Sequence, residues 1–193
     1  MPSRYSGFTL IELLIVVAII AILAAIAVPN FLEAQTRSKV ARAKADMRTI
    51  RTALESYAVD FNKYPDHATD TWHPSLLDIP MLTTPVAYLA TFPSEAFPRK
   101  PDDLYKDPNF FGDGRYYRYY NTKRWEITFP ELSRQGLKWY LMSNGPDLDN
   151  DVHDDDGVIA EHFLAGRNYM HYDSTNGSRS SGDIINNNMK IAP

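Results

Sequence analysis

Two hydrophobic patterns follow one another without a break near the N-terminus. Residues 8–28 are apolar at almost every position, and this run has about the 20 residues that a helix needs to cross a bilayer. From residue 30, apolar residues recur every three or four positions, which predicts an amphipathic helix with one apolar stripe. The stripe consists of Val40, Ala43, Met47, Ile50, Leu54, Tyr57 and Phe61. Together the patterns predict one helix from Phe8 to Tyr64, about 85 Å long, whose second half packs against the chain's own domain.

Two prolines bear on the shape and length of this helix. Pro29 has no amide donor, so it should kink the helix unless neighbouring residues absorb the defect. Tyr64 precedes Pro65, and the residue before a proline avoids the α region. We therefore expect the helix to end at Tyr64.

A single charged residue, Glu12, lies within the apolar run, close to its start. An ionised carboxylate inside a membrane costs roughly 2.5–3.5 kcal/mol on insertion scales, so it normally has a partner or a function. The surrounding segment Gly7-Phe8-Thr9-Leu10-Ile11-Glu12 resembles the processing site of type IV prepilins and of the pseudopilins of type II secretion. The resemblance implies cleavage after Gly7 by a prepilin peptidase, methylation of Phe8 as the new N-terminus, and a requirement for Glu12 in assembly.

The chemistry of Glu12 agrees with a role in assembly. Cleavage after Gly7 would create an α-amino group on Phe8, which has an ordinary pKa of about 7.7–8.0 and is largely cationic at neutral pH. An unpaired carboxylate would be costly in an apolar filament core, so the ammonium of a neighbouring subunit is its expected counter-ion. The alternative is that Glu12 pairs with the amine of its own Phe8, or is merely tolerated near the membrane interface.

The same segment allows a second interpretation. Ala25-Ile26-Ala27 resembles the cleavage site of a secretory signal, so residues 1–27 could be removed on export. The apolar core before that site is longer than the roughly 7–15 residues of a signal sequence, and it contains Glu12. We favour a short leader, residues 1–7, followed by a retained membrane-spanning helix.

The remainder of the chain predicts an α+β protein, and the resemblance to prepilins and pseudopilins implies a type IV pilin-like fold. In that fold a long N-terminal helix packs on a small antiparallel sheet, and the C-terminal region is rich in loops. The predicted parts are the leader 1–7, the transmembrane or filament-core half of the helix 8–29, and a globular domain 30–193. That domain would comprise the amphipathic helix half 30–64, a proline-rich loop region 65–111, the sheet 112–143, and an acidic loop and tail 144–193.

Three aromatic or alternating segments predict the strands of the sheet: residues 115–120, 125–129 and 137–142. Their spacing suits an antiparallel meander with one face against the helix. Alternating tyrosine and arginine in the first segment could instead stack nucleic-acid bases. The net charge of −4 favours cross-strand aromatic packing and gives no general affinity for nucleic acid. A short helix is expected at 84–89, and a loop from Ile184 onward that is held by burial of Ile184 and Ile185.

Carboxylates gather in the segment after the predicted sheet. They are Asp147, Asp149, Asp151, Asp154, Asp155, Asp156 and Glu161. Such a cluster is either solvated or neutralised by a hard cation such as Ca²⁺, which prefers six to eight oxygen ligands. The spacing is not that of an EF-hand, because Val152 and Val158 stand where glycine and glutamate are needed.

Two segments here resemble the calcium-binding closure of the major pseudopilins of type II secretion. They are Ser143-Asn144-Gly145-Pro146-Asp147, which matches a Ser-x-Gly-x-Asp loop, and Gly182-Asp183-Ile184. The resemblance implies a Ca²⁺ ion held by Asp147 and Asp183 and by the carbonyl groups of Met142 and Ser143. Asp149 and Asp151 are further candidate ligands. Many type IV pilins close this region with a disulfide, which a chain without cysteine cannot form.

The sequence offers little support for an enzyme. His153 and His162 lie among aspartates and could form a metal-dependent hydrolytic site, so a membrane-tethered hydrolase is the alternative from another class. The sequence has no H-E-x-x-H, G-x-S-x-G, Walker or dinucleotide motif, and surface-loop histidines are the simpler interpretation.

We therefore predict a structural subunit of a helical filament. It would span the bacterial inner membrane once, with its globular domain on the periplasmic side, and polymerise through its N-terminal helix. Its expected partners are copies of itself, other pseudopilins or minor pilins, the prepilin peptidase and the inner-membrane assembly platform. A periplasmic pseudopilus for protein secretion is favoured, and a surface type IV pilus is the alternative.

Overall fold

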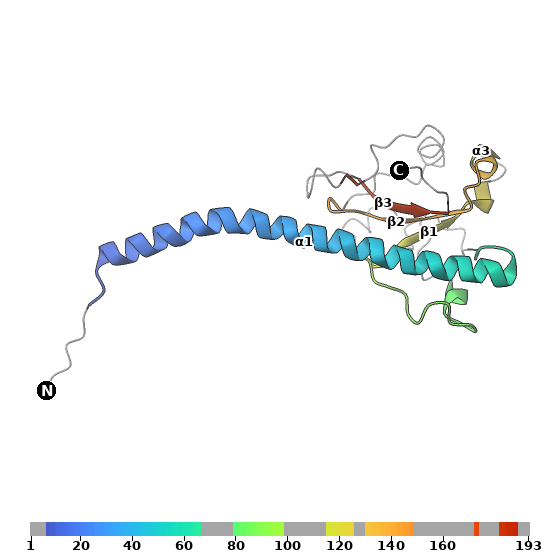
Figure 1. Ribbon diagram of the computed structural model, residues 1–193, viewed down its shortest axis with the longest axis horizontal. Helices are drawn as coiled ribbons and strands as arrows, with labels where there is room; N and C mark the ends of the chain where they lie inside the picture. Colours follow the sequence, from blue (N-terminus) through green and yellow to red (C-terminus); the bar gives the residue numbers. More distant parts are fainter. Residues whose placement is uncertain are drawn as a thin grey trace, which may run out of the picture.

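A long N-terminal helix and a small sheet beside its C-terminal half make up the fold (Figure 1). The computed structural model describes residues 7–66, 79–98, 115–125, 130–148, 172–173 and 182–188. The helix α1 runs from Leu10 to Phe61 and passes through Pro29 without interruption, as a gently curved rod. Its first half projects away from the sheet, whereas its second half lies alongside it.

The helix α1 ends three residues earlier than Tyr64, the end that the proline rule predicts. Asn62 caps its C-terminus in the left-handed conformation, with a φ of 54°, and asparagine tolerates that conformation better than most residues. Tyr64 then turns back toward the helix, and its hydroxyl donates a hydrogen bond of 2.8 Å to Glu55.

The sheet has three antiparallel strands in the order β1-β2-β3, which are Arg118–Asn121, Trp139–Ser143 and Ile184–Asn187. The strand β2 is central, with Tyr120 of β1 opposite Tyr140 and Ile185 of β3 opposite Met142. The rings of Tyr120 and Tyr140 stack at 4.5 Å, which is the cross-strand aromatic packing that the sequence predicts.

The third strand is not the predicted one. Trp125 ends the 3-10 helix η3, Thr122–Trp125, so the predicted strand at 125–129 does not begin there, and residues 126–129 lie outside the described residues. The edge strand is instead β3, in the segment predicted to be a loop. Its asparagines gave no strand signal, and its conformation depends on pairing with β2, some forty residues away in the sequence. Ile184 is buried as expected, whereas Ile185 is partly exposed.

The short helices outside α1 also differ from the prediction. The helix predicted at 84–89 is absent: residues 84–91 form turns and bends, and the Thr84–Pro85 peptide is cis. A 3-10 helix, η2, spans Pro80–Leu82 instead, with Pro80 in its first turn, a position where proline is well tolerated. A further helix, α3, spans Pro130–Arg134.

The core lies between the second half of α1 and the sheet. The predicted stripe is buried from Val40 to Tyr57, together with Ala53, whereas Phe61 is half exposed and stacks on Tyr57 at 4.4 Å. The sheet contributes Tyr119, Trp139, Leu141 and Ile184, and the proline-rich region contributes Ile79, Leu82 and Leu89. The predicted fold, a long helix packed on a small antiparallel sheet, is thus confirmed.

Candidate functional site

The N-terminal motif forms the entrance to α1. Gly7 and Phe8 precede the helix, the side chain of Phe8 is 70% exposed, and a Cβ placed on Gly7 would contact nothing. The peptide bond between these two residues therefore lies in an open, non-helical segment. The roles assigned to Gly7 and Phe8, cleavage and methylation, stay predictions.

Glu12 forms a capping box with Thr9 at the start of α1. One carboxylate oxygen of Glu12 accepts hydrogen bonds from the backbone N–H of Thr9 at 2.9 Å and from its hydroxyl at 2.7 Å, and the N–H of Glu12 donates to the Thr9 hydroxyl at 3.3 Å. These bonds satisfy two donors that a helix N-terminus otherwise leaves unpaired. This capping role of Glu12 was not predicted, although the spacing Thr-x-x-Glu before an apolar run is its known signal.

The first half of α1 carries an apolar surface that no described residue covers. Every residue from 10 to 32 is exposed, including eight that are large and branched near its middle: Leu14, Ile15, Val16, Val17, Ile19, Ile20, Ile22 and Leu23. An 18-residue window of α1 has a mean hydropathy of 3.1, and none of it is buried. By length and composition, α1 could cross a membrane.

The two segments of the predicted closure do meet in the structure. Asp147 Oδ2 accepts a hydrogen bond of 3.0 Å from the backbone N–H of Gly182, and Ser143 lies opposite Ile184 in the sheet. Gly145 has a φ of 70°, and a Cβ at this position would collide with the carbonyl oxygen of Gly182. Glycine is thus needed at 145 both for its conformation and for this close approach.

The predicted metal ligands divide into two groups. Met142 and Ser143 lie in β2, Asp147 follows it, and Asp183 is fully buried beside β3. Asp149 and Asp151 lie outside the described residues, as do the histidines of the alternative hydrolytic site. Within the described part of the chain no three acidic or histidine side chains form a cluster suited to a metal. The ligand set available there is two carboxylates and backbone carbonyls, which are oxygen donors of the kind that Ca²⁺ prefers.

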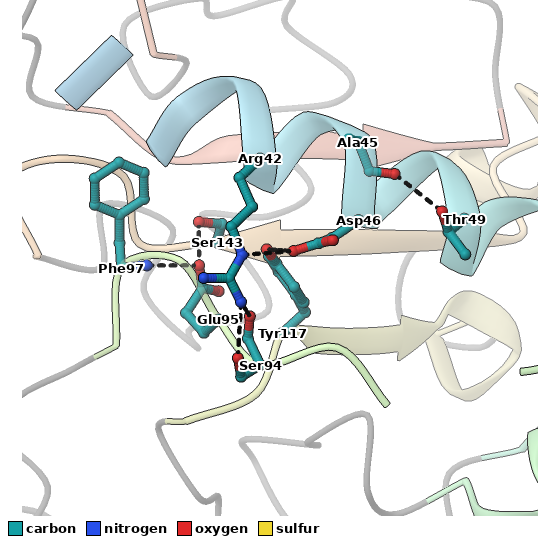
Figure 2. A network of polar contacts seen from close by, with 9 residues as sticks. All are labelled: Arg42, Ala45, Asp46, Thr49, Ser94, Glu95, Phe97, Tyr117 and Ser143. Carbon is teal, nitrogen blue, oxygen red and sulfur yellow. Dashed lines mark hydrogen bonds and ion pairs between the residues drawn. The ribbon is translucent and has the colours of Figure 1, made fainter. Parts of the chain in front are cut away.

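A buried polar network holds the start of this loop (Figure 2). Glu95 Oε1 accepts hydrogen bonds from Ser143 Oγ at 2.7 Å and from the N–H of Phe97 at 3.1 Å. In addition, the Arg118 guanidinium donates a hydrogen bond to the side-chain oxygen of Asn144. The Nδ2 of Asn144 donates a hydrogen bond of 3.2 Å to the carbonyl oxygen of Phe97. Burial raises the pKa of the Glu95 carboxyl to about 7, although its hydrogen bonds oppose the shift.

The same network reaches α1. Arg42 Nε lies 3.5 Å from Asp46 Oδ2, and the guanidinium of Arg42 donates a hydrogen bond of 3.0 Å to the hydroxyl of Ser94 (Figure 2). The hydroxyl of Tyr117 donates a hydrogen bond of 3.0 Å to Asp46 Oδ2. The proline-rich segment is thereby fixed between the helix and β2. Sequence reasoning missed Glu95, and its only signal was an isolated carboxylate in a stretch with apolar and aromatic neighbours.

Two models of known protein families match this chain. A model of the prokaryotic N-terminal methylation motif matches residues 2–28, and the model of type II secretion system (T2SS) protein G matches residues 30–161. The chain belongs to the T2SS protein G family. The predicted resemblance to pilin-like proteins is therefore confirmed, and the family and its named relatives are structural filament subunits, not enzymes. The motif and the exposed apolar helix together indicate membrane anchoring.

Individual relatives of this protein G family member come from both kinds of filament. The type IV major pilin protein PilA of Myxococcus xanthus is 52% identical over 67 residues, which are 35% of this chain and 30% of PilA. The T2SS core protein G of Pseudomonas aeruginosa is 47% identical over 62 residues, 32% of this chain and 44% of the relative. The corresponding protein of Aeromonas hydrophila is 39% identical over 62 residues, 32% and 43% of the two chains. The matches span less than half of each relative. No solved structure matches the chain.

Proposed function

We propose that this protein is a pseudopilin, a subunit of the periplasmic filament of type II secretion. The observation that carries the proposal is the protein G match over residues 30–161, because it covers most of the predicted globular domain 30–193. The identities to individual relatives span only about 60 residues and are shared by pilins and core protein G, so they do not favour one filament. The proposed partners are copies of this chain, other pseudopilins, the prepilin peptidase and an inner-membrane platform.

A surface type IV pilin is the second candidate, because the relatives include a type IV major pilin, PilA, which is 52% identical over 67 residues. Deletion of the gene in the source bacterium separates the two. For a pseudopilin, secreted proteins should accumulate in the periplasm while surface filaments persist. Loss of sheared surface filaments with normal secretion would instead identify a pilin.

In the proposed assembly pathway the subunit is first inserted in the inner membrane, and it then enters the filament through the apolar half of α1. The exposed side chains of residues 10–32 would exchange lipid contacts for packing against the same half of neighbouring subunits. Processing should occur after Gly7, in the open segment before α1. Intact mass and N-terminal sequencing of protein from cells should give N-methylated Phe8. A mature chain beginning at Val28 would instead support removal as a secretory signal.

Glu12 is proposed to pair with the Phe8 ammonium of a neighbouring subunit once the leader is removed. The capping box gives this proposal a sharp test, since glutamine at position 12 retains an acceptor for Thr9 but carries no charge. Under the pairing proposal both Glu12→Gln and Glu12→Ala should be processed normally and fail to enter filaments. If Glu12→Gln assembles normally and only Glu12→Ala fails, helix capping alone explains the requirement.

We further propose that Ca²⁺ stabilises the closure of the globular domain. Asp147 and Asp183 would supply carboxylate oxygens, and Met142 and Ser143 backbone carbonyls, with Asp149 and Asp151 as additional candidates. The support is the chemistry of this donor set and the meeting of its two segments at the Asp147–Gly182 hydrogen bond. A bound ion would neutralise the buried Asp183 and tie the loop to β3 in a chain that has no disulfide.

A further inference from the structure

A cleft with several charged and polar lining residues lies at the end of α1 farthest from Phe8, between residues 62–66 and the ends of β1 and β2. Its volume is about 410 Å³, which falls within the range of roughly 300–1,000 Å³ that is usual for small-molecule sites. No residue of the apolar half of α1 lines it, so a role for this cleft is separate from filament assembly through that half.

Three lysines from separate segments converge on the cleft. Lys63 follows α1, Lys123 belongs to η3, and Lys138 immediately precedes β2. The lining includes one carboxylate, Asp66, which lies 3.9 Å from the Lys63 ammonium. Within the described part of the chain neither Lys123 nor Lys138 forms an ion pair. The lining thus carries a net charge of about +2 on a chain whose net charge is −4.

Buried polar residues hold the backbone of the cleft in place. Asn121 and Thr122 are only 7% and 3% exposed. Asn121 donates to the carbonyl of Pro65 at 2.9 Å and accepts from the N–H of Lys123 at 3.0 Å, while the N–H of Thr122 donates to the carbonyl of Lys138 at 3.0 Å. The attachment points of the lysines are therefore fixed before any ligand arrives, which lowers the ordering cost of binding.

The charges around the cleft favour one side of it. The C-terminal end of α1 carries a partial negative charge that disfavours anions, and Lys63 at that end is already close to Asp66. Lys123 and Lys138 belong to a different part of the lining, next to the end of β1 and the start of β2. We propose that this cleft binds a small ligand with two or more phosphate or carboxylate groups, held chiefly by Lys123 and Lys138. Lysine ammonium groups suit such ligands because they act as mobile point charges.

Calorimetric titration of the full-length protein in detergent, in calcium-free buffer, tests the proposal. The probes are pyrophosphate and citrate, with glucose as a neutral control. We expect at least one anion to bind and glucose not to bind. The double variant Lys123→Gln, Lys138→Gln should weaken anion binding by about tenfold or more. The matched control Lys39→Gln, Lys44→Gln removes the same charge from α1 outside the cleft and should change binding by less than about twofold.

A second variant separates the cleft from general charge attraction. Ala58 lines the cleft on α1 and is partly exposed, so Ala58→Phe should fill the space without changing the charge or breaking the helix. Weaker anion binding by this variant, with unchanged circular dichroism, supports the proposal. Equal losses in the Lys39 and Lys44 control would overturn it, as would unchanged affinity in Ala58→Phe or no binding by the wild type up to about 10 mM probe.

Discussion

The two halves of α1 have the same secondary structure and opposite surroundings. All residues from 10 to 32 are exposed, whereas between Val40 and Tyr57 seven side chains are buried against the sheet and the proline-rich segment. The continuity of a helix therefore does not predict what the helix packs against. The distribution of apolar residues around the helix does predict it. A helix that is apolar on all sides needs lipid or other subunits as cover, whereas a helix with one apolar stripe needs only the chain's own domain.

Truncation of one leucine in each half of α1 should have very different effects on stability. Leu54→Ala removes a fully buried side chain, and such changes cost about 2–5 kcal/mol of unfolding free energy. Leu14→Ala, in a residue that is 61% exposed, should leave the stability of the globular domain unchanged. Denaturation of the full-length protein in detergent, followed by the fluorescence of buried Trp139, measures both. Equal destabilisation would mean that the first half also packs on the domain.

The stability of the globular half should also depend on pH through Glu95. Burial raises the pKa of this carboxyl from 4.5 to about 7, so the folded state favours its protonated form. The contribution of Glu95 to the free energy of unfolding is therefore fully present below about pH 4.5. This contribution is lost as the pH rises through about 7, which lowers the free energy of unfolding by up to about 3 kcal/mol.

Urea denaturation in EDTA at pH 5 to 8 measures this loss. Glu95→Gln keeps an acceptor for Ser143 and should flatten the profile, whereas Glu131→Gln, at an exposed position of α3, should not. An unchanged slope in Glu95→Gln would assign the pH dependence to other groups.

Calcium should sharpen the same contrast if it binds the closure between β2 and β3. A ligand that binds only the folded state stabilises it by about 2.7 kcal/mol at a hundredfold excess over Kd. The Tm of the globular domain should be higher in calcium than in chelator, with magnesium a poor substitute. The variants Asp147→Asn and Asp183→Asn should lose the shift, and Glu131→Ala should keep it. The same Tm in calcium and in chelator would contradict calcium binding and indicate that the acidic segment is only solvated.

The smallest expected effect concerns the start of α1. Thr9→Ala removes the capping box, a change worth about 0.5–2 kcal/mol to a helix N-terminus. Since the first half of α1 contacts no other described element, amide exchange should accelerate only in its first turn, and the unfolding of the domain should not change. Thr9→Ser keeps the hydroxyl and should behave as the wild type. Destabilisation of the whole domain by Thr9→Ala would couple the halves more tightly than the structure indicates.

The features that could be predicted from the sequence are those encoded by residues close together along the chain. The 3.6-residue period from Val40 to Tyr57 predicts both the helix and its buried face, because each side chain's position on a helix follows from its number alone. The motif around Gly7, Phe8 and Glu12 is likewise contiguous, and the aromatic segments at β1 and β2 carry their own strand preference. Even the Thr9–Glu12 capping box was available, since its two members are three residues apart.

Features whose members are far apart in the sequence depend on how the chain packs. The asparagine-rich β3 becomes a strand because β2 offers it backbone partners, and Glu95 becomes a buried acceptor because Ser143 lies beside it. Lys63, Lys123 and Lys138 share one cleft because the end of α1 meets the ends of two strands. None of these residues has a local pattern that specifies its partner, since pairing over tens of residues depends on how the whole chain packs.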